Sequence, residues 1–167
     1  MAVARWLQDV AFGDVLDAGL EDGVWVVRRA RLEVAQMPVL GERVALCTWC
    51  SGIGPRTAER RTTVEGDRGG AVEAVAVWAH LDPVTGVPAR LGERFQEIYG
   101  PSAAHVNNAV YWAALEEGPV IPAACVVEAE HRAPAVAGPA VVVRDGDRTW
   151  VTSTQGEVHA SFEVSAS

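Results

Sequence analysis

Hydrophobic and polar residues follow two different periodicities in the first half of the chain. Apolar residues from Val3 to Val10 recur at helical spacing, which predicts a helix over Val3–Phe12. Four runs of β-branched or alternating residues follow, separated by Gly and Pro. They predict strands at Val24–Gln36, Arg43–Ser51, Arg56–Val64 and Ala71–Leu81. In the third strand charged residues alternate with uncharged ones, which predicts that one of its faces is exposed. The fourth strand has apolar residues on both faces, which predicts that it is central in the sheet.

The second half repeats this order of elements. Asn107 or Asn108 is suited to cap a helix that runs to about Glu117, where Gly and Pro stop it. The pattern then predicts strands at Ala124–His131, Ala140–Arg144, Thr149–Thr154 and Val158–Val164.

Short sequence similarities link the two halves. The segment Gly70–Ala74 is similar to Gly156–Ala160, and Pro38–Val44 is similar to Pro134–Val141. Each half is too small to cover its own sheet, so two such units are expected to join as a pseudo-dimer.

This arrangement predicts an α+β fold. One long helix wrapped by a curved antiparallel sheet is the hotdog layout. We therefore expect a double hotdog, with residues 1–95 and 96–167 as its two halves. An ordinary α+β domain without internal symmetry is the alternative.

Composition excludes several classes of function. All 14 basic residues are Arg and none is Lys, which excludes a Schiff-base lysine and a Walker-type phosphate loop. The net charge of -8 disfavours nucleic-acid binding. Residues 1–95 carry 11 Arg and 13 acids, a net charge of -2, and the remainder carries -6, so an acidic partner is expected to dock on the first half.

The sequence also favours a cytoplasmic protein without a membrane span. No run of about 18 apolar residues exists, and Met1–Asp14 does not resemble a signal peptide.

The three cysteines do not suggest a metal or redox site. Cys47 and Cys50 form a C-x-x-C within a predicted strand, where residues three apart point to opposite faces. We expect buried structural thiols at these positions and at Cys125, without disulfides or a bound metal.

Several motifs in this order resemble the acyl-acyl carrier protein thioesterases. In the first half they are Trp25–Arg29, Thr48-Trp49, Arg60-Arg61 and Trp78–Asp82. In the second half His105-Val-Asn-Asn108 is followed by Tyr111, as in related hotdog thioesterases.

The resemblance implies hydrolysis of an acyl thioester of acyl carrier protein or coenzyme A. It also implies a place in fatty-acid or polyketide biosynthesis and requires no cofactor. The oxyanion donors are implied to be backbone N–H groups at a helix start near His105–Asn108.

The sequence departs from the family at its catalytic positions. The family pattern places Asp four residues and Asn two residues before His105, where this chain has Pro101 and Ala103. A family Glu on the strand after the helix aligns with about Ala133. Of the usual set only His105 remains, either as general base or thioester-positioning donor or as a helix-start residue bonded to the other half.

Other residues are candidates for the missing roles. Glu116 lies on the predicted helix, where some hotdog thioesterases place a carboxylate, and its alternative is a solvated helix end. Capping the helix needs only one of Asn107 and Asn108. The other is expected to contact the opposite half of the chain. The candidates for lining an acyl slot between helix and sheet, with core packing as the alternative, are Trp49, Trp78, Tyr111 and Trp112.

Arginines on the predicted strands form a further group of candidates. They could meet phosphopantetheine or an acidic carrier protein, or form a solvated sheet face. These residues are Arg28, Arg29, Arg31, Arg56, Arg60 and Arg61.

Two other functions fit the same fold. A hotdog site without a water-activating carboxylate could dehydrate, isomerise or cyclise a carrier-bound intermediate. A non-catalytic acyl-binding pseudo-enzyme is the second alternative. Pairing of whole chains into a homo-oligomer stays open.

Overall fold

A computed structural model describes residues 2–20, 23–105, 125–131, 140–145, 148–153 and 158–166. The first half contains helix α1 (Ala2–Asp17) and strands β1 (Val24–Gln36), β2 (Val44–Ile53), β3 (Thr57–Gly66) and β4 (Ala71–Leu81). Helix α2 (Glu93–Tyr99), a 3-10 turn η1 (Gly100–Ser102) and strand β5 (Ala104–His105) follow. The later strands are β6 (Cys125–His131), β7 (Ala140–Asp145), β8 (Arg148–Ser153) and β9 (Val158–Ala166).

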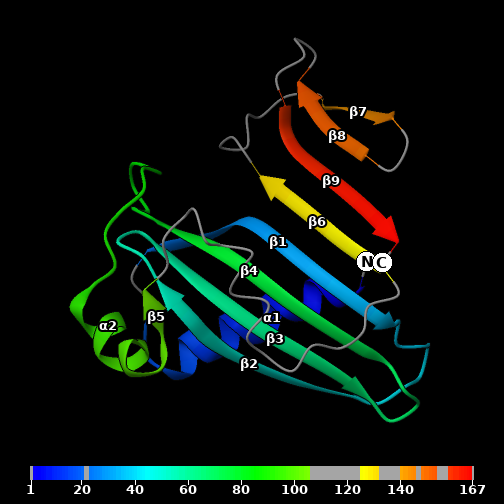
Figure 1. The fold of residues 1–167 in the computed structure, drawn as a ribbon. Helices are drawn as coiled ribbons and strands as arrows, with labels where there is room; N and C mark the ends of the chain where they lie inside the picture. Colours follow the sequence, from blue (N-terminus) through cyan, green and yellow to red (C-terminus); the bar gives the residue numbers. More distant parts are fainter. Residues whose placement is uncertain are drawn as a thin grey trace.

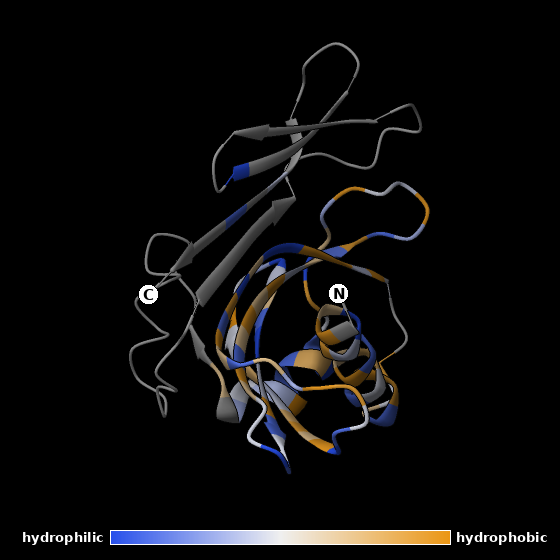
Figure 2. Ribbon diagram, turned by 90° about the vertical axis from the view of Figure 1, so that its right-hand side faces the viewer, coloured by the Kyte–Doolittle hydropathy of each residue, from blue (hydrophilic) through white to orange (hydrophobic). Residues whose placement is uncertain are grey.

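The strands form one sheet in the order β5-β2-β3-β4-β1-β6-β9-β8-β7. Neighbouring strands are antiparallel except β2 and β5, which are parallel. Helix α1 lies across one face of the first four long strands (Figure 1). In a view turned by 90°, the curved sheet can be seen to surround this helix partly, as the predicted hotdog layout of the first half requires (Figure 2).

The strand order is mirrored about the contact between β1 and β6. From that contact outward, the first half runs β1, β4, β3, β2 and the second runs β6, β9, β8, β7. Within the repeated segments, Ala71–Ala74 lies in β4 and Val158–Ala160 lies in β9, and these strands occupy equivalent places. At the contact itself, Arg29 lies opposite Glu130 and Arg31 opposite Glu128 in the register.

The ends of α1 explain why it is longer than predicted. The helix continues through Gly13 to Asp17, because packing of Ala11 and Val15 offsets the cost of about 1 kcal/mol for a glycine in a helix. It ends in a Schellman motif, in which the N–H groups of Gly19 and Leu20 donate to the carbonyls of Leu16 and Val15. Gly19 has φ +66, a conformation that favours glycine.

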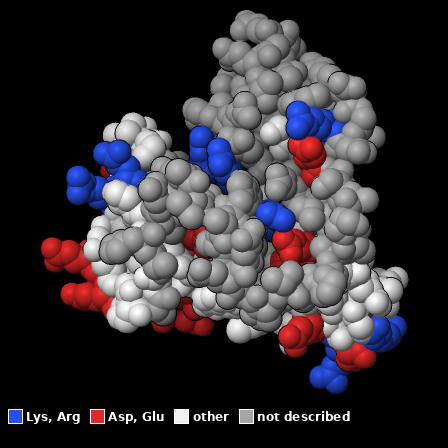
Figure 3. All heavy atoms as spheres, in the orientation of Figure 1, with Lys and Arg blue, Asp and Glu red and all other residues white. Residues whose placement is uncertain are grey.

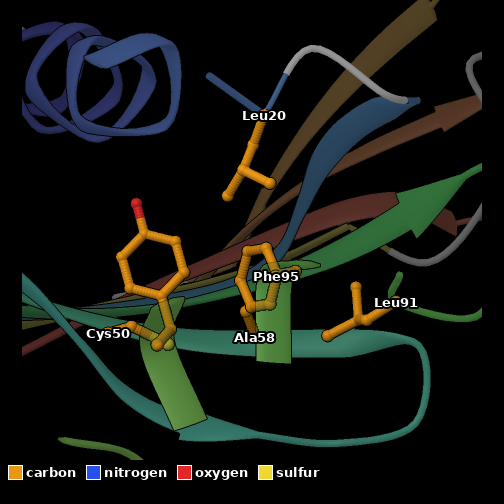
Figure 4. Packing of buried hydrophobic residues seen from close by; sticks show 6 residues of the cluster. Leu20, Cys50, Ala58, Leu91 and Phe95 are labelled. Atoms are coloured by element: carbon orange, nitrogen blue, oxygen red, sulfur yellow. The ribbon is translucent and has the colours of Figure 1, made fainter. Parts of the chain in front are cut away.

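The core has two centres along α1. At one end Val3 packs against the fully buried Val64 and Val72, together with Val34. At the other end α2 contributes Phe95 and Tyr99 to a cluster around Leu20, Cys50, Ala58 and Leu91 (Figure 4). Between these centres the sheet carries smaller side chains.

Two expectations about the elements were wrong. Strand β3 is mostly buried rather than half exposed, since one of its faces lies under α1 and even Glu59 on the other is 2% exposed. The segment 91–105, for which the sequence pattern predicted no helix or strand, contains α2, η1 and β5. The spacing of Phe95 and Tyr99, both buried, is the signal that could have revealed α2.

Candidate functional site

The face of the first-half sheet that α1 covers, which we call the inner face, carries different kinds of side chain at its two ends. Because paired residues point to the same side, the register defines rows across β1, β4, β3 and β2. An aliphatic row at one end is followed by rows with small side chains and then by aromatic residues. In order the rows are Val34–Val72–Val64–Leu46, Leu32–Ala74–Thr62–Thr48, Ala30–Ala76–Arg60–Cys50, Val27–Trp78–Ala58–Ile53 and Trp25–His80.

An apolar slot of about 280 Å³ lies between α1 and the aromatic end of this face. Phe12 and Val24 line it and are 61% and 45% exposed, so they border its opening. Its other lining residues are Ala11, Val15, Gly23, Trp25, Ala58, Arg60, Trp78 and Phe95. A concave apolar site with few polar groups is typical of sites for small apolar ligands.

A half-buried polar network lies beside the slot and reaches its lining through Arg60. Arg60 Nη2 donates to Asp14 Oδ2 at 2.6 Å, and Tyr99 OH donates to the same oxygen at 2.6 Å. Arg60 Nη1 also lies 3.4 Å from Thr48 Oγ1, and its guanidinium lies over the Tyr99 ring at 5.5 Å. The network thus joins α1, β3, β2 and α2 beside the slot.

The position of Arg60 corrects one sequence expectation. Arg60 was grouped with arginines that could meet phosphopantetheine or form a solvated face, but it is 6% exposed and points toward α1. Asp14, which the sequence did not single out, supplies its counter-charge. Only the tertiary structure brings these residues together, because 46 positions separate them.

Tyr99 gives the network a pH dependence at the alkaline end. Burial raises the pKa of Tyr99 from 10.0 to about 12, assisted by its hydrogen bond to Asp14 and by the charge of that carboxylate. The unfolded chain loses this proton near pH 10 while the folded protein keeps it until about pH 12. The contribution of Tyr99 to the free energy of unfolding is therefore complete below pH 10.0. It is lost as the pH rises toward about 12.

We expect the stability advantage of the wild type over Tyr99→Phe to shrink across this interval. Urea unfolding of both proteins at a series of pH values measures the difference. Ultraviolet titration of tyrosinate provides a second readout, because the variant should lack the late-ionising phenol. A stability difference that is constant from neutral pH to the alkaline end would contradict the assignment.

His80 lies against Trp25 and Gly23, two residues that line the slot. It is 7% exposed, its ring centroid lies 5.0 Å from that of Trp25, and Nδ1 lies 3.4 Å from the Ala89 carbonyl oxygen. Gly23 lies directly against this ring with φ +92, and a Cβ there would overlap it. The sequence prediction that Ala71–Leu81 is a central strand is confirmed, and His80 on it is buried.

Gly23→Ala is therefore expected to destabilise the protein more than Gly86→Ala. Gly86 also has positive φ, +67, but nothing lies within 4 Å of its added Cβ. Gly86→Ala should cost about 1 kcal/mol for the backbone alone, and Gly23→Ala about 1 to 3 kcal/mol more for displacing His80. Urea unfolding measures both free energies, and equal losses would mean that the His80 ring yields without cost.

The predicted tryptophans separate into two positions. Trp78 lines the slot, as predicted for an acyl-site candidate, although its role in binding stays a prediction. Trp49 does not, because Thr48 and Cys50 point inward and alternation turns Trp49 to the opposite face, where it is 38% exposed. The expectation that Trp49 faces the core was wrong.

The predicted catalytic residues lie at the edge of the described structure. His105 is the second residue of β5 and pairs in register with Ile53 of β2. The predicted helix, capped by Asn107 or Asn108, would begin after this strand, outside the described residues, and stays a prediction. The remaining candidates, Asn107, Asn108, Tyr111, Trp112 and Glu116, lie outside the described residues.

The residues at the family's missing positions are described. Pro101 is exposed in η1, and Ala103 packs against the core cluster that contains Phe95 and Tyr99. Neither side chain can ionise or accept a proton.

The cysteines occupy opposite faces of β2, as the strand prediction required. Cys47 is exposed, so the expected burial was wrong for this thiol, and Cys50 is buried. Burial raises the pKa of Cys50, which keeps its thiol protonated and unreactive. In the described ranges no three potential metal-ligating side chains gather, and none of the described helices is long and apolar enough to cross a membrane.

A helix laid against a curved antiparallel sheet, with an apolar slot between them, places the first half in the hotdog class. Residues 2–99 match the family described as the acyl-ACP thioesterase N-terminal domain. Because this match covers more than half of the 167 residues, the chain belongs to that family. The resemblance inferred from the sequence is confirmed.

Solved structures extend the likeness of fold to the whole chain. An acyl-ACP thioesterase from Bacteroides thetaiotaomicron superposes with a TM-score of 0.69 at 18% identity, covering 98% of this chain and 87% of that one. The 12:0-ACP thioesterase from Umbellularia californica gives a TM-score of 0.66 at 16% identity, with 99% and 89% covered. An uncharacterised protein of Mycobacterium tuberculosis is 24% identical over 181 residues, covering 85% of this chain and 72% of its own length.

Proposed function

We propose that this protein hydrolyses an acyl thioester whose acyl chain occupies the slot beneath α1. The observation that carries the proposal is the position of the slot, which lies entirely within residues 2–99, the part that matches the thioesterase family. Each methylene group buried there contributes about 0.8 kcal/mol to binding. The slot therefore suits an unbranched hydrocarbon chain.

The catalytic chemistry is assigned to the segment that begins at β5. In this proposal His105 removes a proton from water as it attacks the thioester carbonyl, and Asn107 and Asn108 position the substrate or neighbouring backbone. Backbone N–H groups that follow His105 hold the oxyanion, and the proton returns to the departing thiolate. Glu116 is the candidate carboxylate, because Pro101 and Ala103 cannot take the roles that the family gives to Asp and Asn.

The leaving group is proposed to be acyl carrier protein or coenzyme A. The two solved structures of similar fold are ACP thioesterases, which supports a carrier protein. Arg side chains visible in Figure 3 lie in separate groups, with acidic side chains next to several of them. The contact with a carrier is therefore not assigned to one patch. A cytoplasmic location and homo-oligomer formation stay predictions.

We propose further that the whole chain is a double hotdog, with halves at 1–95 and 96–167. The mirrored strand order about β1 and β6 supports it, because two hotdog units related by a twofold axis between these strands give that order. The boundary itself stays a prediction, and α2 spans it.

A panel of acyl thioesters with thiol detection tests the function. Purified protein is incubated with acyl-coenzyme A and acyl-carrier substrates of increasing chain length, and free thiol is recorded with time. Release that depends on chain length is the expected result. A second arm uses the variant Ala11→Leu, in which the larger side chain fills part of the slot. This variant should lower thiol release from long chains more than from short ones.

A second function is favoured by the replaced residues Pro101 and Ala103. A site without the family carboxylate could act on a carrier-bound intermediate by dehydration, isomerisation or cyclisation instead of hydrolysis. Exchange of α-carbon hydrogen in deuterium oxide without thiol release would favour it. Tight acyl binding with neither exchange nor release would favour a pseudo-enzyme.

A further inference from the structure

A second, smaller hollow lies next to the slot along α1. This rear hollow has a volume of about 60 Å³ and lies one to two helical turns toward the N-terminus, beneath Ala4, Leu7 and Gln8. Two residues line both spaces, Arg60 from β3 and Trp78 from β4. Their side chains therefore separate the slot from the rear hollow, and we call them the Trp78–Arg60 wall.

The wall is held in place from several sides. Asp14 and Thr48 bind the Arg60 guanidinium, which also lies over the Tyr99 ring. Trp78 is on a strand with neighbours on both sides, where Val27 and Ala58 are its register partners. The Arg60 side chain cannot leave without breaking its hydrogen bonds, and the main-chain pairing of β4 fixes the position from which the Trp78 side chain extends.

The rear hollow exists because the sheet carries alanine where larger residues would fill it. Ala30 and Ala76 are register partners in the row that contains Arg60, and Ala74 lies in the next row. Beyond them lies the row containing Val64 and Val72, both 0% exposed. Space for a longer ligand is thus present but lies behind the wall.

From this geometry we infer that Trp78, supported by Arg60, sets the upper limit of acyl-chain length. The inference rests on the proposed function, in which the slot holds the acyl chain. Up to the wall, each added methylene should tighten binding about fourfold, and beyond it the gain should stop. The rear hollow, with a volume of about 60 Å³, offers room for a further part of the acyl chain.

Fatty-acid binding tests this without depending on catalysis. Saturated acids from hexanoic to hexadecanoic acid displace a fluorescent dansyl fatty acid from the full chain, and the dissociation constant is plotted against chain length. Trp78→Leu should move the point where the gain stops to longer chains. Adding Ala76→Val to Trp78→Leu should move it back, because valine fills the rear hollow.

Two single variants keep the test decisive even if Trp78→Leu does not fold. Ala76→Val alone, behind the wall, should leave the limit unchanged, whereas Ala11→Leu, in front of it, should shorten it. The inference is overturned if folded Trp78→Leu keeps the wild-type limit, or if Ala76→Val alone shortens it. Failure of every acid to bind the wild type would instead remove the proposed acyl slot itself, and with it the inference.

Discussion

Replacement of His105 by alanine is expected to lower kcat/KM for thioester hydrolysis about a hundredfold to ten-thousandfold, the usual effect of losing a positioned base. Stability should change little, because β5 is held by main-chain pairing with Gly52 and Ile53 of β2, which alanine preserves. Thiol release measures the activity, and a thermal melt measures the stability.

Neighbouring substitutions separate the role of His105 from a general disturbance of β5. Ala104→Ser changes the preceding residue of the same strand and should retain activity. Glu116→Gln should lose activity to a similar extent if that carboxylate replaces the missing family residue. Wild-type rates in His105→Ala would show that the catalytic segment has been assigned wrongly.

The second large effect concerns the buried ion pair beside the slot. Asp14→Ala should destabilise the fold by about 2 to 3 kcal/mol, because it leaves the buried Arg60 charge beside neutral hydroxyl groups without its carboxylate partner. Arg60→Met should cost less, about 1 to 2 kcal/mol. The Asp14 side chain is 37% exposed and can be hydrated, whereas that of Arg60 is 7% exposed. Urea unfolding gives both free energies.

An exposed pair on the same helix is the matched control. Arg5 and Asp9 are 3.5 Å apart with side chains 83% and 66% exposed, so Asp9→Ala should cost less than about 0.5 kcal/mol. A loss for Asp14→Ala as small as that for Asp9→Ala would show that Arg60 finds water or another partner. A larger loss for Arg60→Met than for Asp14→Ala would reverse the proposed asymmetry.

The positions of the strands followed from local sequence signals. Bounds for Val24–Gln36 and Ala71–Leu81 agree with β1 and β4, and those of β2 and β3 differ by one or two residues. Glycine, proline and β-branched residues act over a few positions, so their effects can be read without the fold. The turn that starts at Asp82 illustrates this, since its carboxylate accepts hydrogen bonds from the N–H groups of Val84 and Thr85.

The family was also readable from the sequence, because its motifs lie in order along the chain. The slot was not. Its walls come from α1, β1, β3, β4 and α2, and only their packing turns Arg60 inward and Trp49 outward. The pairing of Asp14 with Arg60 and Tyr99 depends on contacts between distant segments, for which local patterns carry no information.

By itself the sequence determined which segments become strands and which family the chain belongs to, since both depend on residues close together or in fixed order. Tertiary structure alone decided where the apolar space lies, how deep it is and which side chains divide it. The physical reason is that an enclosed volume is a property of side chains from several elements packed against one another. Alternation along a strand fixes two faces, but which of them the helix covers is settled only when the chain has folded.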